Sequence, residues 1–417
     1  MCDFNKIGKA GAICALISSF LSLGGAFSFT SPAWAEEVKP DVQALEEPAV
    51  RSVNHFTLQA ARLLAPGGEN FFFSPYSIIS ALGMTYAGAK EETAGEMEKS
   101  LLFSPLLHGS LGALTQDLSS ETGKNSESLT MANRIWLNKG LGIHADFAET
   151  LRRHYGSTAA EVDFKKDPSG SKKEINSWVE EQTHERIRDL IQKIDPDTQM
   201  ILVNAIYFNG RWENPFSENR TSPKPFHVTD SKTKDVPMMQ QNRRLLYGEV
   251  DDVKLLRLPY KGRLSMLLAL PKKGVGVEEM LKALAEDSRL FDRWTRSLSR
   301  YEVDLWLPKF RTESRYELKD VLTALGVRQA FEKEADFSGI TDDEKLRIDS
   351  VIHKTFIEVD EKKTEAAAAT GIIMVRTTAV APDSIRRAEF HADRPFLYFI
   401  VDDATRIILF AGRQSFK

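Results

Sequence analysis

The residues of this chain that are best suited to catalysis do not form a local catalytic motif. His184-Glu185 begins as a zinc-protease motif does, but Arg188 stands where the second zinc-binding histidine is required. The stretch His108-Gly-Ser-Leu-Gly112 resembles the nucleophile elbow of a hydrolase, but it begins with histidine instead of glycine and follows no predicted strand. We therefore expect a surface loop there.

Phosphate and metal sites are also absent from the sequence pattern. Gly140-Leu-Gly142 and Gly274-Val-Gly276 lack the third glycine and the lysine of phosphate-binding loops, so both are predicted to be turns. The eight histidines are scattered, and no group of His and Asp has metal-ligand spacing. We expect no metal and no cofactor. A triad assembled across the fold would leave no local motif, so a hydrolase stays a hypothesis without supporting residues.

The composition is that of a folded globular protein without a strongly charged surface. Of the 417 residues, 42% are hydrophobic, and 55 Lys and Arg face 59 Asp and Glu for a net charge of −4. Such a balance gives no cationic field that would attract a polyanion. We expect no nucleic-acid partner.

The N-terminus has the three regions of a secretory signal peptide. Lys6 and Lys9 precede an apolar stretch over residues 10–29, and Ala33-Trp34-Ala35 provides a small-residue cleavage site. We predict that residues 1–35 are removed and that the mature chain, residues 36–417, is secreted, or periplasmic in a Gram-negative source.

Cleavage at this point has a chemical consequence, because Cys2 and Cys14 both lie in the removed segment. The mature chain would have 53 basic and 58 acidic residues, a net charge of −5, and no cysteine for disulfides or thiol chemistry. The alternatives are an uncleaved membrane anchor, which Gly24 and Gly25 would interrupt, and a lipoprotein, which would need a small residue in place of Ile13.

The elements that must position any site are helices and strands mixed along the chain. Ser74-Pro75 predicts a helix start with serine as N-cap, and apolar periodicity predicts helices over 175–191 and 318–325. Strands are predicted over 301–307, 353–359 and 200–208, the last buried on both faces, and a terminal hairpin over 396–401 and 407–410. No linker divides the chain, so we predict one domain over residues 36–417.

The helix propensity of the stretch from Glu361 to Met374 disagrees with the sequence on either side of it. Propensity alone favours a helix over 361–369, which contains four successive alanines, but the stretch follows a predicted strand and leads into Ile-Ile-Met-Val. At a period of two, one uncharged face is formed by Thr364, Ala366, Ala368, Thr370, Ile372 and Met374. Lys363 and Glu365 lie on the other face. The pattern permits either an exposed loop or an added strand.

These residues resemble those of the serpin family. The hinge Glu361-Lys-Lys-Thr364-Glu365-Ala-Ala-Ala-Ala369-Thr370-Gly371 resembles the reactive-loop hinge of inhibitory serpins. Further matching motifs follow in family order from about Val53 to the C-terminus: Asn70-Phe-Phe-Phe-Ser74-Pro75-Tyr-Ser77-Ile, Val203-Asn204-Ala-Ile-Tyr-Phe-Asn-Gly210-Arg-Trp212, Leu307-Pro-Lys309-Phe310, Ala335-Asp-Phe-Ser-Gly339, Arg394-Pro-Phe396 and Leu409-Phe-Ala-Gly412-Arg.

The resemblance implies an α+β serpin fold with three β-sheets, eight to nine helices and an exposed reactive-centre loop at about residues 361–390. It implies that the chain is not an enzyme but a monomeric suicide substrate. A target serine protease would be trapped as a covalent acyl-enzyme complex while the freed hinge enters the central sheet as a new strand.

The family spacing sets the expected reactive bond thirteen residues after Thr364, between Thr377 and Thr378. An uncharged Thr377 would suit an elastase-like pocket. The alternative bond, Arg376–Thr377, would suit a trypsin-like enzyme. The hinge residues implied by the resemblance are Glu361, Lys363, Thr364, Glu365, Ala366, Ala367, Ala368, Ala369 and Thr370.

Six further positions match conformational controls of the family. Ser74, Ser77, Asn204 and His353 match a polar cluster beneath the point where the central strands part, and Trp212 matches a tryptophan above it. Lys309 and Glu361 match a bridge between hinge and sheet. At the surface, such a bridge would contribute only about 0–1 kcal/mol.

Two departures from the family pattern affect the expected function. Lys363 replaces the glycine that inhibitory members have before the hinge threonine, which would stiffen the pivot. This favours, as the alternative, a non-inhibitory serpin that serves as a ligand carrier or chaperone. The stretch 100–123 contains no Lys or Arg, so we expect no heparin-like cofactor.

Overall fold

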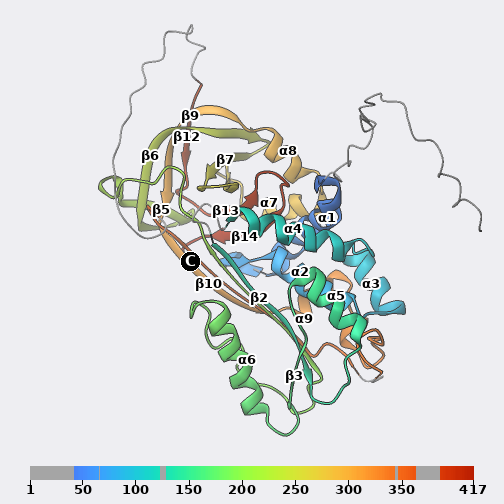
Figure 1. Cartoon of the computed structure of the whole chain (residues 1–417). Coiled ribbons are helices and arrows are strands. Elements are labelled where there is room, and N and C mark those ends of the chain that lie inside the picture. Colours follow the sequence, from blue (N-terminus) through green and yellow to red (C-terminus); the bar gives the residue numbers. More distant parts are fainter. Residues whose placement is uncertain (1–41, 65, 123–127, 343–345, 363–385) are drawn as a thin grey trace, which may run out of the picture. The chain divides into compact units, whose positions relative to one another are not determined.

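The computed structural model describes residues 42–64, 66–122, 128–342, 346–362 and 386–417 (Figure 1). The predicted signal peptide lies outside these ranges. The helices of the described residues are α1 (Val42–Leu64), α2 (Pro75–Tyr86), α3 (Glu91–Leu101), α4 (Leu107–Thr122), α5 (Ala145–Tyr155), α6 (Pro168–Gln182), α7 (Val277–Glu286), α8 (Leu290–Arg296) and α9 (Lys319–Leu325). None of these helices is both long and apolar enough to cross a membrane.

The strands of the described residues form two hydrogen-bonded sheets. Their bounds are β1 (Phe71–Phe73), β2 (Ser128–Asn138), β3 (Ala160–Val162), β4 (Met200–Asn209), β5 (Ser222–Thr229), β6 (Lys232–Val250), β7 (Val253–Pro259), β8 (Leu264–Pro271), β9 (Ser299–Pro308), β10 (Phe310–Glu317), β11 (Ser350–Val359), β12 (Arg387–His391), β13 (Phe396–Asp402) and β14 (Ile408–Gln414).

The smaller sheet, here called the central sheet, has the strand order β10-β11-β4-β2-β3. Its middle strand, β4, is buried over every residue except Asn209. β4 pairs in parallel with β11 and antiparallel with β2. Because β4 is covered on both faces, its nearly continuous apolar sequence fits its position.

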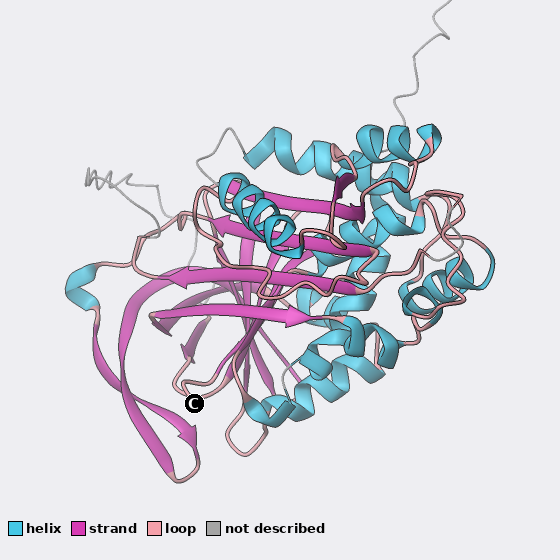
Figure 2. Ribbon diagram, turned by 90° about the horizontal axis from the view of Figure 1, so that it is seen from below, coloured by secondary structure: helices cyan, strands magenta, loops and turns pink. Residues whose placement is uncertain are grey.

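The larger sheet has the order β1-β14-β13-β8-β7-β6-β9-β12, with β5 paired to β6. We expected three sheets. The 19-residue strand β6 pairs with β5 over its first part, with β9 over Met238–Tyr247 and with β7 near its end. Strands that we expected in two sheets are therefore joined by β6 into one. Figure 2 shows β5 and β6 reaching out from the rest of this sheet.

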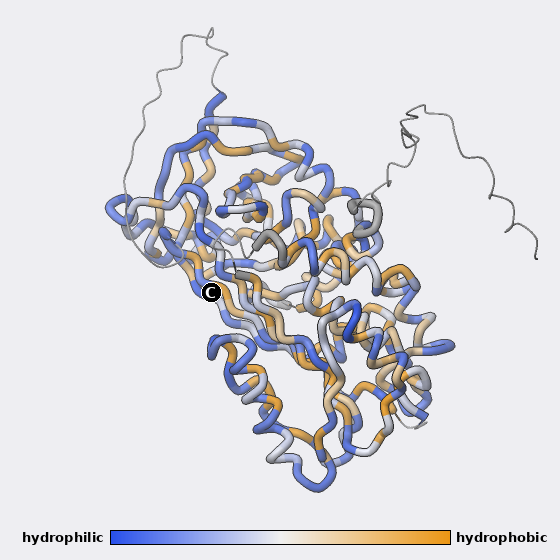
Figure 3. The backbone as a smooth tube through the Cα atoms, in the orientation of Figure 1, coloured by the Kyte–Doolittle hydropathy of each residue, from blue (hydrophilic) through white to orange (hydrophobic). Residues whose placement is uncertain are grey.

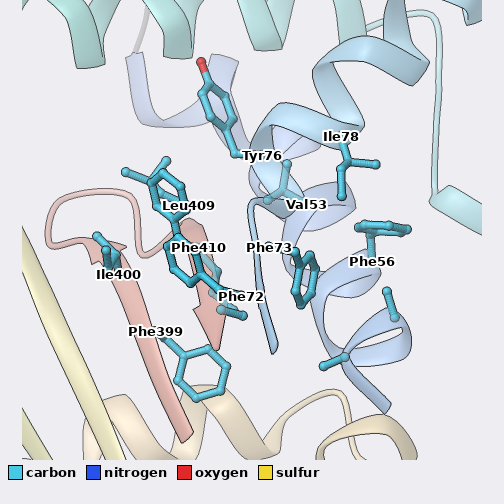
Figure 4. Close-up of a cluster of buried hydrophobic side chains, with 14 of the residues drawn as sticks. Val53, Phe56, Phe72, Phe73, Tyr76, Ile78, Phe399, Ile400, Leu409 and Phe410 are labelled. Atoms are coloured by element: carbon cyan, nitrogen blue, oxygen red, sulfur yellow. The ribbon is translucent and has the colours of Figure 1, made fainter. Parts of the chain in front are cut away.

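Two hydrophobic clusters hold the elements together. The main cluster extends through most of the described helices and both sheets, and part of it lies where α1 and α2 meet β1, β13 and β14. There Phe72 stacks on Phe410 at a ring distance of 5.1 Å (Figure 4). The second cluster packs α6 and the chain after it on the other face of the central sheet. Along α6, hydrophobic positions recur among hydrophilic ones (Figure 3).

Most predicted elements are confirmed, and two are wrong. The predicted 175–191 helix ends at Gln182, because His184 and Glu185 adopt positive φ angles of 49° and 60°. Ile187, Leu190 and Ile191 lie beyond the helix but still pack in the second cluster. Their apolar spacing therefore reflects burial of a non-helical segment. The expected surface loop at His108 is instead the first turn of α4. The serine–proline pair Ser104-Pro105, of the same kind as Ser74-Pro75, stands just before this helix and was the available signal for its start.

Candidate functional site

The candidate site lies where β4 and β11 pair, a junction here called the seam. The parallel ladder runs from Ser350 opposite Ile201 to Phe356 opposite Tyr207, with no strand between the two. Asn204 and His353 are directly opposite each other in this register. The polar cluster predicted from the family motifs therefore lies on the seam itself.

His353 ties the seam to the helix beneath it. Its Nε2 accepts a hydrogen bond of 3.0 Å from the backbone N–H of Ser74, and its Nδ1 bonds the side-chain oxygen of Asn204. These partners fix a neutral imidazole with its proton on Nδ1. Burial lowers the pKa of His353 to about 3, against which the bond to Asn204 acts. Protonation of Nε2 would break the bond to Ser74.

The remaining cluster members connect α2 with β14, β4 and β2. Ser74 is the N-cap of α2, and its hydroxyl oxygen accepts a hydrogen bond from the backbone N–H of Ser77. The hydroxyl proton stays available and is donated to the Leu409 carbonyl at 2.7 Å. The Asn204 amide donates to Ser77 and, at 2.6 Å, to Asn133. Ser77 in turn donates to Asn133 at 3.0 Å. All four predicted members are thus brought together.

Asn133 is a member that sequence reasoning missed. It lies on β2 opposite Asn204 and binds both Asn204 and Ser77. An asparagine within the strand sequence Leu-Thr-Met-Ala-Asn-Arg-Ile-Trp-Leu was the available signal, since an amide that is partly covered in a strand needs partners. The partners come from residues more than 50 positions away, which no local pattern reveals.

Trp212 and Phe216 hold the end of β11 where the hinge begins. The Trp212 indole donates to the Asp360 carbonyl at 2.8 Å and stacks on Tyr260 with a ring distance of 4.4 Å. The Phe216 N–H donates to the Glu361 carbonyl at 2.9 Å. These bonds fix the backbone up to Glu361.

Lys309 and Glu361 form the predicted pair with an Nζ–Oε2 distance of 2.6 Å. The bridge lies at the edge of the surface, because the Lys309 side chain is 37% exposed and the Glu361 side chain only 9%. Burial opposes ionisation of Glu361, but hydrogen bonds, foremost the one from Lys309, together with the Lys309 charge outweigh it, and the pKa is lowered. The next residue, Lys362, pairs with Glu218 at the surface at 2.7 Å.

The remaining predicted site residues lie outside the described part of the chain. These are the hinge residues Lys363, Thr364, Glu365, Ala366, Ala367, Ala368, Ala369 and Thr370, and the reactive-bond residues Arg376, Thr377 and Thr378. The chain is described again from Arg386, which leads into β12 at the edge of the larger sheet. The structure thus fixes both flanks of the predicted loop.

The described residues offer no alternative chemistry at the seam. His353 contacts the Ser74 backbone nitrogen instead of its hydroxyl, so the two are not a nucleophile and base. Within the described ranges no group of three His, Cys, Asp or Glu could hold a metal ion. The cluster can hold β4 and β11 together through the bond between Asn204 and His353. These two strands must separate if a third strand is to enter between them.

Comparison with known proteins gives the family. The family model described as serpin (serine protease inhibitor) matches residues 51–415. The leukocyte elastase inhibitor of Bos taurus is 38% identical over 360 residues, which are 84% of this chain and 93% of the relative.

Solved structures agree with the sequence relatives. Serpin48 of the insect Tenebrio molitor, described as highly specific, superposes with a TM-score of 0.77 at 32% identity, over 89% of this chain and 99% of the other. Human thyroxine-binding globulin complexed with thyroxine superposes with a TM-score of 0.75 at 31% identity, over 89% and 98%. The chain belongs to the serpin family.

Proposed function

We propose that this serpin is a secreted suicide-substrate inhibitor of a serine protease with an elastase-like pocket. The protease serine attacks the Thr377 carbonyl, the bond to Thr378 breaks, and Thr378 leaves as a protonated amine. Thr377 is then held by the enzyme as an acyl ester. Entry of residues 364–377 between β4 and β11 carries the enzyme away before water cleaves the ester.

The observation that carries this proposal is the direct pairing of β11 with β4, combined with the small-residue hinge that follows β11. A strand returning from β11 would run antiparallel to both neighbours, so one slanted parallel ladder would be exchanged for two antiparallel ones. A net gain of roughly ten hydrogen bonds at about 0.5–1.5 kcal/mol each is on the order of 10 kcal/mol. This equals an ordinary folding free energy and can drive trapping.

The residues Asp360 and Glu361, here called the anchored pivot, support the same mechanism. Asp360 and Glu361 are held by Trp212, Phe216 and Lys309. A strand that reverses direction after Glu361 therefore has a fixed starting point. The alternating small and uncharged residues from Thr364 present little steric obstruction on entry.

The choice of target rests on the reactive-bond residue. Thr377 is uncharged and β-branched, and the similarity to a leukocyte elastase inhibitor supports an elastase-like enzyme. If the protease cleaves after Arg376 instead, the target is trypsin-like. The lack of Lys and Arg in α4 supports inhibition without a heparin-like cofactor.

Residues 1–35 support secretion of a single domain over residues 36–417, because their order of charged, apolar and small residues is that of a signal peptide. A secreted inhibitor would meet extracellular proteases. Because residues 36–417 contain no cysteine, its stability there would come from core packing and not from disulfides. Acting as a monomer, it offers one reactive bond to one enzyme.

A carrier function is the second candidate, and Lys363 is the observation that favours it. A side chain in place of glycine restricts the pivot. The likeness to a thyroxine-binding globulin supports a serpin fold that serves binding instead of inhibition.

One experiment separates these functions. We expect elastase to form an SDS-stable complex with the protein and to release a C-terminal peptide beginning at Thr378. The double variant Ala366→Arg, Ala368→Arg should be cleaved at the same bond without trapping, because charged long side chains cannot enter the sheet. Cleavage of the natural protein without a complex would support the carrier, and a peptide beginning at Thr377 would assign the trypsin-like register.

A further inference from the structure

The hinge end of the seam is closed by an aromatic pair outside the polar cluster. Tyr207 of β4 and Phe356 of β11 are the last register pair of the parallel ladder on that side. Their rings stack at 6.1 Å with an interplanar angle of 24°. Both residues are buried, at 5% and 7% exposure. A strand that starts from Glu361 meets this pair before it meets Asn204 and His353.

The pair lies on the face of the sheet opposite the polar cluster. Asn204 contacts α2, so alternation along β4 sends Tyr207 to the other face, where Val203 and Ala205 pack in the second cluster. The seam is therefore fastened on both faces, by hydrogen bonds on the α2 side and by rings on the α6 side.

Two arginines extend the ring pair across four segments of the chain. Arg186, in the segment after α6, lies 5.6 Å from the Tyr207 ring, and Arg311 of β10 lies 4.7 Å from the Phe356 ring. Both arginines are exposed, and a cation over an aromatic ring at an exposed site contributes about 0.5–1 kcal/mol. The stack therefore links the segment after α6 to β10 across the seam.

Side chains of β11 and β10 also donate hydrogen bonds to main-chain carbonyls of the same segment. Lys354 of β11 donates to the Arg188 carbonyl at 2.8 Å, and Arg315 of β10 donates to the Leu190 carbonyl at 2.8 Å. An entering strand would move β11 from β4 by about 4.8 Å, one strand spacing. Rings that stack at 6.1 Å lose contact over such a distance.

We propose that the Tyr207–Phe356 stack is the gate of the seam, and that its opening sets how fast a strand enters and hence how the acyl-enzyme divides between trapping and release. This rests on the proposed inhibitory function. The stack must open first because it closes the hinge end of the ladder, and its rings contribute more than their buried area alone.

The structure supplies variants that separate the gate from general stability. Tyr207→Leu and Phe356→Leu keep an apolar side chain but remove the ring pair. Tyr207→Phe keeps the ring and removes a hydroxyl that has no hydrogen-bond partner among the described residues. Phe291→Leu is the matched control, since it removes a buried ring paired with Phe399 in the larger sheet.

The test measures uptake of a synthetic peptide with the sequence of residues 364–377 by each intact protein, followed by the gain in heat resistance. We expect the two gate variants to take up the peptide about three- to tenfold faster than the natural protein, and Tyr207→Phe and Phe291→Leu to stay within about twofold. Equal acceleration by Phe291→Leu, or no acceleration by the gate variants, would overturn the gate.

A second arm with elastase keeps the two proposals distinct. We expect the gate variants to trap a larger share of the enzyme per cleavage event. If peptide uptake follows the expected order while no variant forms an SDS-stable complex, the gate stands and the inhibitory function fails. If complexes form at unchanged yield and uptake is unchanged, the function stands and the gate fails.

Discussion

Acid should weaken the seam through His353. The imidazole is held neutral, with a pKa of about 3 against an ordinary value of 6.5. Because the folded-state pKa lies below the unfolded one, the unfolded chain takes up the proton first as the pH falls. The stabilisation is therefore complete above pH 6.5 and is lost between pH 6.5 and pH 3.

The size of this effect follows from the shift of the pKa. About 3.5 units correspond to roughly 5 kcal/mol over the whole range, and about 2 kcal/mol is already lost at pH 5. A loss of this order is a substantial part of an ordinary folding free energy. We expect the urea midpoint to fall steeply between pH 7 and pH 4.5.

The assay compares urea unfolding of the natural protein and of His353→Gln at several pH values. Glutamine can accept from Ser74 and donate to Asn204 but does not titrate, so the difference between the two curves isolates His353. This matters because burial, helped by His154, also lowers the pKa of His108 to about 4. A difference that stays constant from pH 7 to pH 4.5 would refute a neutral, hydrogen-bonded His353.

The remaining predictions concern the anchored pivot. Lys309→Met should lower the free energy of unfolding by about 1–3 kcal/mol in urea titrations, since it leaves the buried Glu361 carboxylate unpaired, whereas Lys309→Arg should recover most of the loss; equal losses in both variants would contradict the ion pair. Trp212→Phe keeps a ring on Tyr260 but removes the donor to Asp360, and should cost about 1 kcal/mol by the same measurement; an unchanged midpoint would show that the indole bond contributes nothing.

The sequence predicted those parts of the fold that local chemistry determines. Ser74-Pro75 starts α2 as expected, and Gly326 closes α9 with a φ of 109°. β4 shows the continuous apolar pattern of a strand covered on both faces. The helix expected to reach Ile191 stops at Gln182, because burial in the second cluster produces the same apolar spacing without helical backbone.

The family motifs predicted part of the candidate site. They did not predict contacts that depend on strand register, such as those of Asn133 and of the Tyr207–Phe356 pair. Ser74, Ser77, Asn204 and His353 meet on the seam. The stacking of Tyr207 on Phe356 joins residues about 150 positions apart, and nothing near either of them in the chain indicates the other. Such contacts follow from register alone.

The position of the terminal hairpin has a consequence for biosynthesis. β13 and β14, made from the last residues of the chain, are buried along their whole lengths between β8 and β1. The larger sheet therefore stays incomplete on the ribosome until β14 has been synthesised, and a stop codon within Ile408–Gln414 removes part of an interior strand. Conversely, a chain nicked between Lys362 and Arg386 keeps its C-terminal piece as a tightly held second polypeptide.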